Sequence, residues 1–192
     1  FVLFHYWPMY GVQIAFKDFV ATKGIKGSPW AGFRHFQRFF RSHHFWPLIR
    51  NTLGLSIYQL LASFPAPIIL ALLINEVMNN RFKRTVQTVT YAPHFLSTVV
   101  VVGMMTTMLS PQTGIINKLL QSMGKERIYF MGESQWFRHL YVWSGVWQHT
   151  GWNAIIYLAA LSGINIELHE AAIVDGASKL ERIWYINIPG IL

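Results

Sequence analysis

The sequence of 192 residues contains no cysteine and few charged side chains. Without cysteine, neither a disulfide framework nor a thiolate metal site can form. Charged residues make up only 12% of the chain and hydrophobic residues 53%, which is unlike a typical soluble domain. The composition therefore predicts a membrane protein. The formal net charge of +8 comes from basic residues beside apolar segments, which favours contact with lipid headgroups or water over contact with nucleic acid.

The common catalytic and metal-binding motifs are also missing. The sequence has no Gly-x-x-x-x-Gly-Lys-Ser/Thr loop to hold ATP, and its eight histidines form no His-Glu-x-x-His pair. Ser144-Gly145 and Ser162-Gly163 lack the Gly-x-Ser-x-Gly frame of a nucleophilic serine. We therefore predict no catalytic residue, no metal site and no cofactor. A membrane enzyme would need a clustered reactive site, and the sequence shows none.

Long uncharged segments predict membrane helices over residues 48–75, 85–109 and 139–166. At about 1.5 Å per residue, each is long enough for a hydrocarbon layer of roughly 30 Å. Residues 1–16 also lack charge and predict the end of an earlier membrane helix. Since the chain begins at Phe1 and stops at Leu192, we expect a piece of a longer protein that lacks both ends. The prolines in Pro65-Ala66-Pro67 predict a kink in the first of the three long helices.

The segments between these helices are polar: residues 17–47, 76–84, 110–138 and 167–190. Aromatic and basic residues alternate within 30–40 at spacings that predict a short amphipathic helix, and a nucleic-acid surface is the weaker interpretation of that stretch. A second short helix is predicted around residues 115–123. The predicted fold class is an all-α, polytopic bundle of membrane helices.

The last polar segment has the most specific pattern. Ile173, Ala177, Leu180 and Trp184 recur at helical spacing and predict an amphipathic element with a surface to dock against. The pair Asp175-Gly176 predicts a bend or interruption. Pro189 is expected to end the element.

The order Glu170-Ala-Ala, two residues, Asp175-Gly-Ala, and then Ile186 and Ile188-Pro189 resembles the EAA loop of the permease subunits of bacterial ATP-binding-cassette importers. The family usually has leucine where Ile188 stands. The resemblance implies a type I importer permease whose loop faces the cytoplasm and sits in a groove of the ATPase subunit. The residues that would dock are Glu170, Ala171, Ala172, Asp175, Gly176 and Ala177. A bare Glu-Ala-Ala on a surface helix is the alternative interpretation.

Further strings, among them 4–11, 15–19, 27–30, 64–67 and 91–95, look like the branch of this family that imports polysaccharides or oligosaccharides. The resemblance implies a multi-pass protein of the bacterial cell membrane that works with cytoplasmic ATPase subunits, a second permease subunit and an extracellular substrate-binding protein. ATP would be hydrolysed in the partner. A membrane channel or scaffold whose cytoplasmic loop binds another kind of partner remains the alternative.

The charge distribution opposes this orientation. If residues 167–190 and 76–84 are cytoplasmic, then 17–50 and 115–138 lie outside, and the outer side holds eleven Lys and Arg residues against five inside. The positive-inside rule favours the opposite topology. The motif carries more weight here, because a preceding segment can dominate insertion.

Five polar or aromatic residues within the predicted membrane helices are candidates for the substrate path. They are Tyr58, Gln59, Trp147, His149 and Asn153. Buried polar side chains in a membrane tend to face a cavity or a neighbouring helix, and sugars suit a lining of aromatic faces and amides. The alternative is that these residues form interfacial belts or hydrogen bonds between helices.

Overall fold

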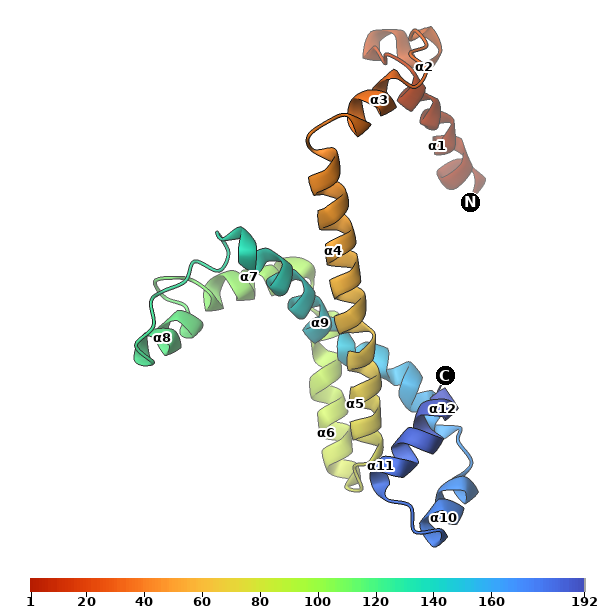
Figure 1. The fold of residues 1–192 in the computed structure, drawn as a ribbon, viewed down its shortest axis with the longest axis vertical. Coiled ribbons are helices and arrows are strands. Elements are labelled where there is room, and N and C mark those ends of the chain that lie inside the picture. Colours follow the sequence, from red (N-terminus) through yellow and green to blue (C-terminus); the bar gives the residue numbers. More distant parts are fainter. Residues whose placement is uncertain (192) are drawn as a thin grey trace. The chain divides into compact units, whose positions relative to one another are not determined.

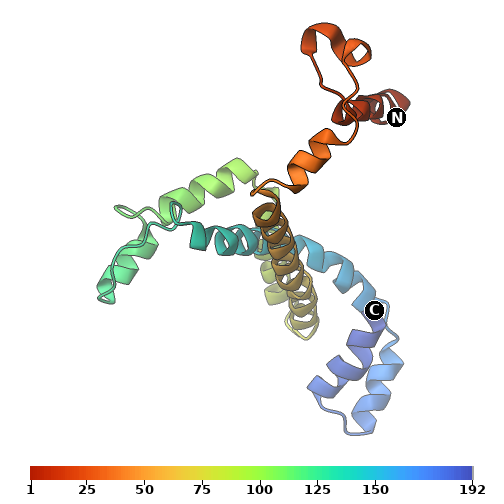
Figure 2. The same ribbon diagram turned by 45° about the horizontal axis from the view of Figure 1, so that its top comes forward.

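The computed structural model describes residues 1–191. These residues form two compact units, residues 1–54 and the residues from 55 onward, and their regular elements are all helices. Figures 1 and 2 show helices joined by turns and by longer loops, such as the one between α8 (Ile115–Ser122) and α9 (Ser134–Ser162). The predicted all-α fold is confirmed.

The first unit begins with one helical segment of mixed geometry. It consists of a π-helical turn, η1 (Val2–Tyr6), a short α1 (Trp7–Met9) and a 3₁₀ segment, η2 (Tyr10–Phe16). Pro8 lies inside this helical segment and has no N–H to donate, which fits the change of helical geometry at α1. The helix predicted over residues 1–16 is present, and its place in a membrane stays a prediction.

The polar segment that follows η2 folds back on itself. Lys17 and Trp30 form an isolated antiparallel bridge. Within the loop that they close, the buried Ser28 hydroxyl accepts from the Val20 N–H at 3.0 Å and donates to the Gly24 carbonyl oxygen at 2.6 Å. The loop therefore has an internal hydrogen-bond network of its own, and it contains two short helical turns, η3 (Ala21–Lys23) and α2 (Gly24–Gly27).

Aromatic rings join the loop to α3 (Arg34–Phe40), the short amphipathic helix that the sequence predicts. The Phe16 ring stacks on Trp30 with 5.8 Å between centroids and lies 5.1 Å from the ring of Phe36. Each aromatic pair of this kind adds about 0.5–1.5 kcal/mol beyond the area that it buries. These contacts hold η2, the loop and α3 together as one unit.

The next two helices, α4 (Phe45–Ser63) and α5 (Pro65–Asn75), follow each other across a single residue, Phe64. Together they form the one helix in residues 1–191 that is by itself long and apolar enough to cross a membrane. Pro65 and Pro67 have no N–H to donate, so the α-helical hydrogen bonding is interrupted at the position where the sequence predicts a kink.

The helix predicted over residues 85–109 is broken in the structure, and its role as a membrane span stays a prediction. The structure has α6 (Asn80–Tyr91), a 3₁₀ turn, η4 (Ala92–Phe95), and α7 (Thr98–Met108), and the chain bends by 101° between them. Pro93 favours the break, and the Ser97 side chain accepts from the Val100 N–H and starts a new helix. Asn79 caps α6 in the same way, so the basic part of the predicted link 76–84 is helical. Counted as one span, this bent pair would be a second helix able to cross a membrane.

A single buried amide holds the loop after α7, which contains the predicted short helix as α8 (Ile115–Ser122). The Asn117 side chain is 1% exposed. Its amide N–H groups donate to the carbonyl oxygens of Leu109, Ser110 and Ile128 at 3.0–3.2 Å, and its carbonyl oxygen accepts from the Ile128 N–H at 2.8 Å. One side chain thereby fixes the end of α7 against the chain that returns toward α9.

The longest helix, α9 (Ser134–Ser162), supplies the core of the second unit. Ala154 and Leu161 of α9 pack on Ala71 and Leu72 of α5, and all four are buried. α9 covers most of the predicted span 139–166, although it is not among the helices that pass as membrane-crossing by length and hydropathy. Polar side chains such as Gln148 and Asn153 lower its hydropathy.

A close approach of backbones joins α9 to α6. A Cβ placed on the buried Gly151 would lie closer than 3.0 Å to the main-chain carbonyl of Thr90. Only glycine fits at such a crossing, since small residues let helix backbones come near each other.

Candidate functional site

The chain leaves α9 at Gly163 and enters α10 (Ile166–Val174), which contains the Glu-Ala-Ala of the sequence motif. Asn165 caps this helix, because its side-chain oxygen accepts from the Glu167 N–H at 3.0 Å. An N-cap of this kind adds about 1 kcal/mol to helix stability. The cap at Asn165 therefore sets the first residue of α10, Ile166, which lies four positions before Glu170.

Gly176 ends α10 in a left-handed conformation, with φ of 82°. The Gly176 N–H donates to the Ile173 carbonyl oxygen at 3.0 Å and the Ala177 N–H donates to the Ala172 carbonyl oxygen at 2.8 Å. This pair of bonds defines a Schellman motif, in which glycine is strongly preferred at the left-handed position. A Cβ added to Gly176 would meet nothing within 4 Å, so the requirement for glycine comes from the backbone and not from crowding.

The next helix, α11 (Lys179–Arg182), starts at once with a capping box. The Glu181 carboxylate accepts from the Ser178 N–H at 2.7 Å, and the Ser178 hydroxyl oxygen accepts from the Glu181 N–H at 3.3 Å. The Ser178 hydroxyl also donates to the Glu181 carboxylate at 2.7 Å. This hydrogen bond, followed by the one from the Ser178 N–H, lowers the pKa of the Glu181 carboxyl below its usual value. A Schellman motif and a capping box in succession give the connection between α10 and α11 a defined shape. Residues 166–182 are called the α10–α11 turn from here on.

Large apolar side chains of this region point away from the rest of the chain. Val174 is 85% exposed, Leu180 78% and Trp184 67%. Glu170 and Ala171 are exposed, and Ala172 and Ala177 are half-buried. Contiguous exposed apolar groups beside a charged residue are typical of an interaction surface.

One part of the predicted pattern is wrong. The Asp175-Gly176 pair interrupts the helix, as the sequence predicts, so Ile173 lies on α10 while Leu180 and Trp184 lie on the following helical segment. The residues at helical spacing therefore do not form one continuous stripe. The apolar surface is instead built from two helices that meet at the turn.

Pro189 does not end the element, contrary to the sequence-based expectation. α11 continues through a π-helical turn, η5 (Ile183–Asn187), into α12 (Ile188–Ile191), which contains the proline. The Ile188 N–H donates to the Ile183 carbonyl oxygen, five residues back. The wider π turn accommodates a proline that would disturb a regular α-helix at this place.

The helical segment after the turn is anchored in the core. Ile183, Ile188 and Ile191 pack against the buried cluster of α5 and α9, and Asn187 is fully buried. The segment that follows the α10–α11 turn in the chain is therefore in contact with α5 and α9.

The five candidates for the substrate path fall into separate surroundings. Gln59 and His149 line one cavity of about 360 Å³, together with Gln148 and Glu133. Asn153 lines another cavity, of about 770 Å³, between α4, α5 and α9. Trp147 is about half exposed and is not among the residues that line these two cavities.

Tyr58 belongs to a hydrogen-bonded cluster that the sequence did not predict. Its hydroxyl oxygen accepts from the Trp143 indole N–H at 2.8 Å and lies 3.0 Å from the His139 Nδ1. His149 has a second role as well, since its Nδ1 lies 3.2 Å from the Nδ1 of His94. His94 in turn stacks on Trp152 with 4.5 Å between ring centroids. Interhelical hydrogen bonding, the alternative weighed for these residues, thus describes the surroundings of Tyr58.

Sequence reasoning missed Gln148 and Glu133. The Gln148 amide donates to the Leu96 carbonyl oxygen at 2.7 Å and ties the 101° bend to α9. The sequence feature that could have identified Gln148 is its position next to His149 in a largely apolar segment. Glu133 precedes α9 and reaches the cavity only because the loop from 110 folds back, which no local pattern shows.

The described residues thus form a helical fold with one or two helices able to cross a membrane, and the Glu-Ala-Ala sequence lies in the α10–α11 turn. Residues 49–192 match the family described as "Binding-protein-dependent transport system inner membrane component". The chain belongs to this family and is a component of the cytoplasmic membrane.

Two relatives from Bacillus subtilis (strain 168) are similar over the whole chain. "Protein LplB" and the "Polygalacturonan/rhamnogalacturonan transport system permease protein YteP" are each 46% identical over 191 residues, which is 100% of this chain and 60% of each relative. A crystal structure of "a bacterial ABC transporter involved in the import of the acidic polysaccharide alginate" contains a chain that is 45% identical, with a TM-score of 0.91. The match covers 100% of this chain and 63% of that one. The chain thus spans about three fifths of the length of these relatives.

Proposed function

We propose that this chain is part of the permease subunit of an ATP-binding-cassette importer for a carbohydrate, most simply an oligosaccharide. Its partners would be cytoplasmic ATPase subunits, a second permease subunit and an extracellular substrate-binding protein. The family match and the relatives named for polysaccharide transport support this proposal. ATP would be hydrolysed in the partner.

The observation that carries the proposal is the construction of the α10–α11 turn. Two successive capping motifs fix its shape, its apolar side chains are exposed, and the helical segment after it packs on α5 and α9. A surface that must pass motion from an ATPase to membrane helices needs this combination, because a flexible loop would absorb the displacement. In this proposal Glu170, Asp175 and the small residues beside them contact the ATPase.

The proposed path for the sugar runs along α9. Gln59 and His149, which line the same cavity, are the better supported pair among the five candidates. Their amide and imidazole groups can donate to and accept from sugar hydroxyls. Tyr58, Trp147 and Asn153 would contribute only if the path extends beyond this cavity.

The test is co-purification of the tagged permease, as it exists in its full-length form, with its ATPase. Glu170→Lys places a cation where the proposed contact has a carboxylate, and we expect at least a tenfold loss of bound ATPase and of ATP-driven uptake. Glu126→Lys is the matched control, since Glu126 is also exposed but lies in the loop of residues 110–138. If both variants retain ATPase and uptake at the native level, the docking proposal fails. Binding of a different protein at the turn would instead support the channel or scaffold alternative.

A further inference from the structure

Positive charge is concentrated in the first unit. Residues 1–54 contain a single carboxylate, Asp18, and seven cationic side chains: Lys17, Lys23, Lys26, Arg34, Arg38, Arg41 and Arg50. The unit therefore carries a formal excess of six positive charges out of the net +8 of the chain. A field of this strength and single sign attracts anionic ligands.

The carboxylate of Asp18 already has basic partners within the unit. The Arg34 guanidinium donates to Asp18, and the His35 Nε2 lies 3.0 Å from the other carboxylate oxygen. The hydrogen bond from Arg34 is the main cause of the lowered pKa of Asp18. Arg38 and Arg41 are exposed and form no ion pair within the described residues.

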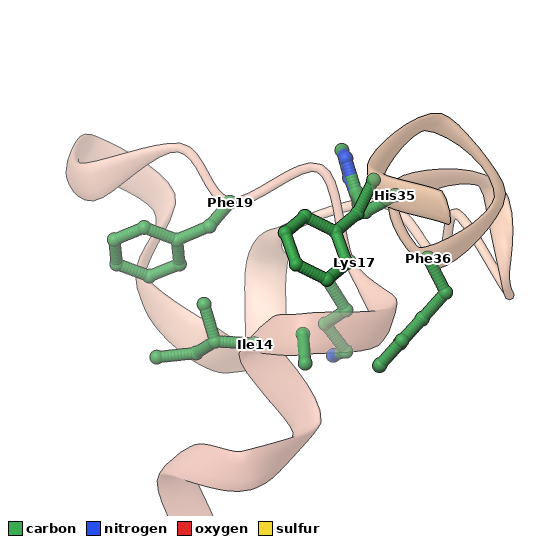
Figure 3. Close-up of a pocket in the computed structure, with 7 residues that line it drawn as sticks. Ile14, Lys17, Phe19, His35 and Phe36 are labelled. Carbon is green, nitrogen blue, oxygen red and sulfur yellow. The ribbon is translucent and has the colours of Figure 1, made fainter. Parts of the chain in front are cut away.

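An open apolar hollow of about 460 Å³ lies on the surface of the same unit. Figure 3 shows Ile14, Phe19 and Phe36 around the hollow, with Lys17 and His35 as its polar members. The Lys17 ammonium donates to the Ile25 carbonyl oxygen at 2.8 Å, so this charge is held in place and cannot swing away into solvent. Aromatic walls with a few fixed polar groups are what a site for a small ligand or a sugar ring requires.

The helix α3 joins the cavity to the free arginines. Arg38, within α3, and Arg41, the C-cap residue that follows it, are three positions apart and lie on the side of the helix that also bears Arg34, the partner of Asp18. The residues of α3 that line the hollow, His35, Phe36 and Phe39, lie on the other side of the helix, roughly 140° around its axis from the arginines. Because a helix with its side chains is only about 10–12 Å across, a ligand of several sugar residues can contact both faces.

The orientation given by the proposed function places this basic unit outside the cytoplasm. Basic residues on the outer side oppose the positive-inside preference. Their presence in such number therefore points to a use for the charge at that surface. A carboxylate-bearing ligand supplies such a use, since arginine pairs with carboxylates through two parallel hydrogen bonds.

We propose that the first unit binds an acidic oligosaccharide, with Arg38 and Arg41 pairing to uronate carboxylates and the aromatic cavity holding a sugar ring. This inference rests on the proposed function and names its substrate class. The relatives named for alginate, printed as an acidic polysaccharide, and for polygalacturonan agree with that class. Anionic lipid headgroups are the competing ligand for the same charges.

The experiment compares two ligands that differ only in charge: an oligogalacturonate of defined length, and the same oligosaccharide after chemical reduction of its carboxyl groups. Equilibrium dialysis with the full permease complex in detergent, without the binding protein, measures affinity directly. For Arg38→Gln/Arg41→Gln we expect about a tenfold weaker affinity for the acidic ligand, which corresponds to roughly 1.4 kcal/mol, and no change for the reduced ligand. The variant keeps its fold because both side chains are exposed.

The matched control is Lys118→Gln/Lys125→Gln, which removes two exposed cations from the second unit. Equal losses in both variants would show a general charge effect and overturn the inference, as would unchanged binding in the arginine variant. If the arginine variant loses affinity only for vesicles that contain anionic lipid, Arg38 and Arg41 bind lipid headgroups and the inference is wrong. ATP-driven uptake into proteoliposomes is measured separately. Absence of uptake in the native complex would contradict the proposed importer function while leaving the binding result to decide the inference.

Discussion

Substitutions at Gly176 can test two properties of the α10–α11 turn separately: its backbone conformation and the contact of its surface with a partner. Gly176 has φ of 82°, and a Cβ there would meet nothing within 4 Å. Alanine in this conformation costs about 1–2 kcal/mol. Since no contact is lost or gained within the chain, this backbone term is the whole expected effect on the free protein.

The assay is amide hydrogen exchange at the Schellman bond between the Ala177 N–H and the Ala172 carbonyl oxygen, which is 2.8 Å long. A cost of 1–2 kcal/mol raises the population of the open turn about 5- to 30-fold, and we expect the exchange rate of this amide to rise by that factor in Gly176→Ala. Gly145→Ala is the control, because Gly145 lies inside α9 and a Cβ there also meets nothing within 4 Å.

Gly176→Asn completes the comparison. Asparagine adopts the left-handed conformation more readily than alanine, so its exchange rate should stay near that of the native protein. If a partner packs closely on the turn, this larger side chain will still weaken binding of the ATPase. Native exchange in Gly176→Ala would refute the argument from backbone conformation, and native ATPase binding in Gly176→Asn would refute a close contact at this residue.

Three further predictions concern the scaffold. Gly151→Ala forces a Cβ against the Thr90 carbonyl, and we expect a loss of about 1–3 kcal/mol in thermal or denaturant unfolding, whereas Gly145→Ala should cost little. Asn117→Leu leaves buried backbone groups at the loop of α8 unpaired, and we expect a loss of about 2–4 kcal/mol together with faster exchange of the Ile128 amide; an unchanged amide would contradict the assigned role. The carboxyl of Asp18 should titrate below its usual pKa of 3.8 in an NMR titration, so the stabilisation that it provides is present above that pH and is lost as the pH falls through the lowered pKa. In Arg34→Gln the pKa should return toward 3.8, and a midpoint that does not move would rule out Arg34 as its main cause.

Local signals in the sequence predicted the elements whose causes are local. Asp175-Gly176 predicted the interruption of the helix, and the prolines after Ser63 predicted the irregularity between α4 and α5. The spacing of aromatic residues predicted α3. In each case the residue type restricts its own backbone, so no knowledge of distant contacts was needed.

The errors arise where distant segments decide the local structure. The break at η4 depends on Gln148 and Trp152 of α9, which hold the bend from a distance of more than fifty residues in sequence. Pro189 continues a helix because the π turn before it relieves the conflict and Ile188 packs in the core. The cavity that contains Glu133 could not be predicted, because its walls come from α4, α7, the following loop and α9.

The membrane orientation of the α10–α11 turn is the claim on which the account depends, and two-sided cysteine labelling tests it most directly. The 192 residues contain no cysteine, so a single Lys179→Cys or Lys26→Cys gives one reactive thiol in this part of the protein. With a membrane-impermeant maleimide, the account predicts that Lys26→Cys is labelled on intact cells and that Lys179→Cys is labelled only on inverted membrane vesicles. Labelling of Lys179→Cys on intact cells would contradict the account, since the turn would then lie on the side where no ATPase can reach it.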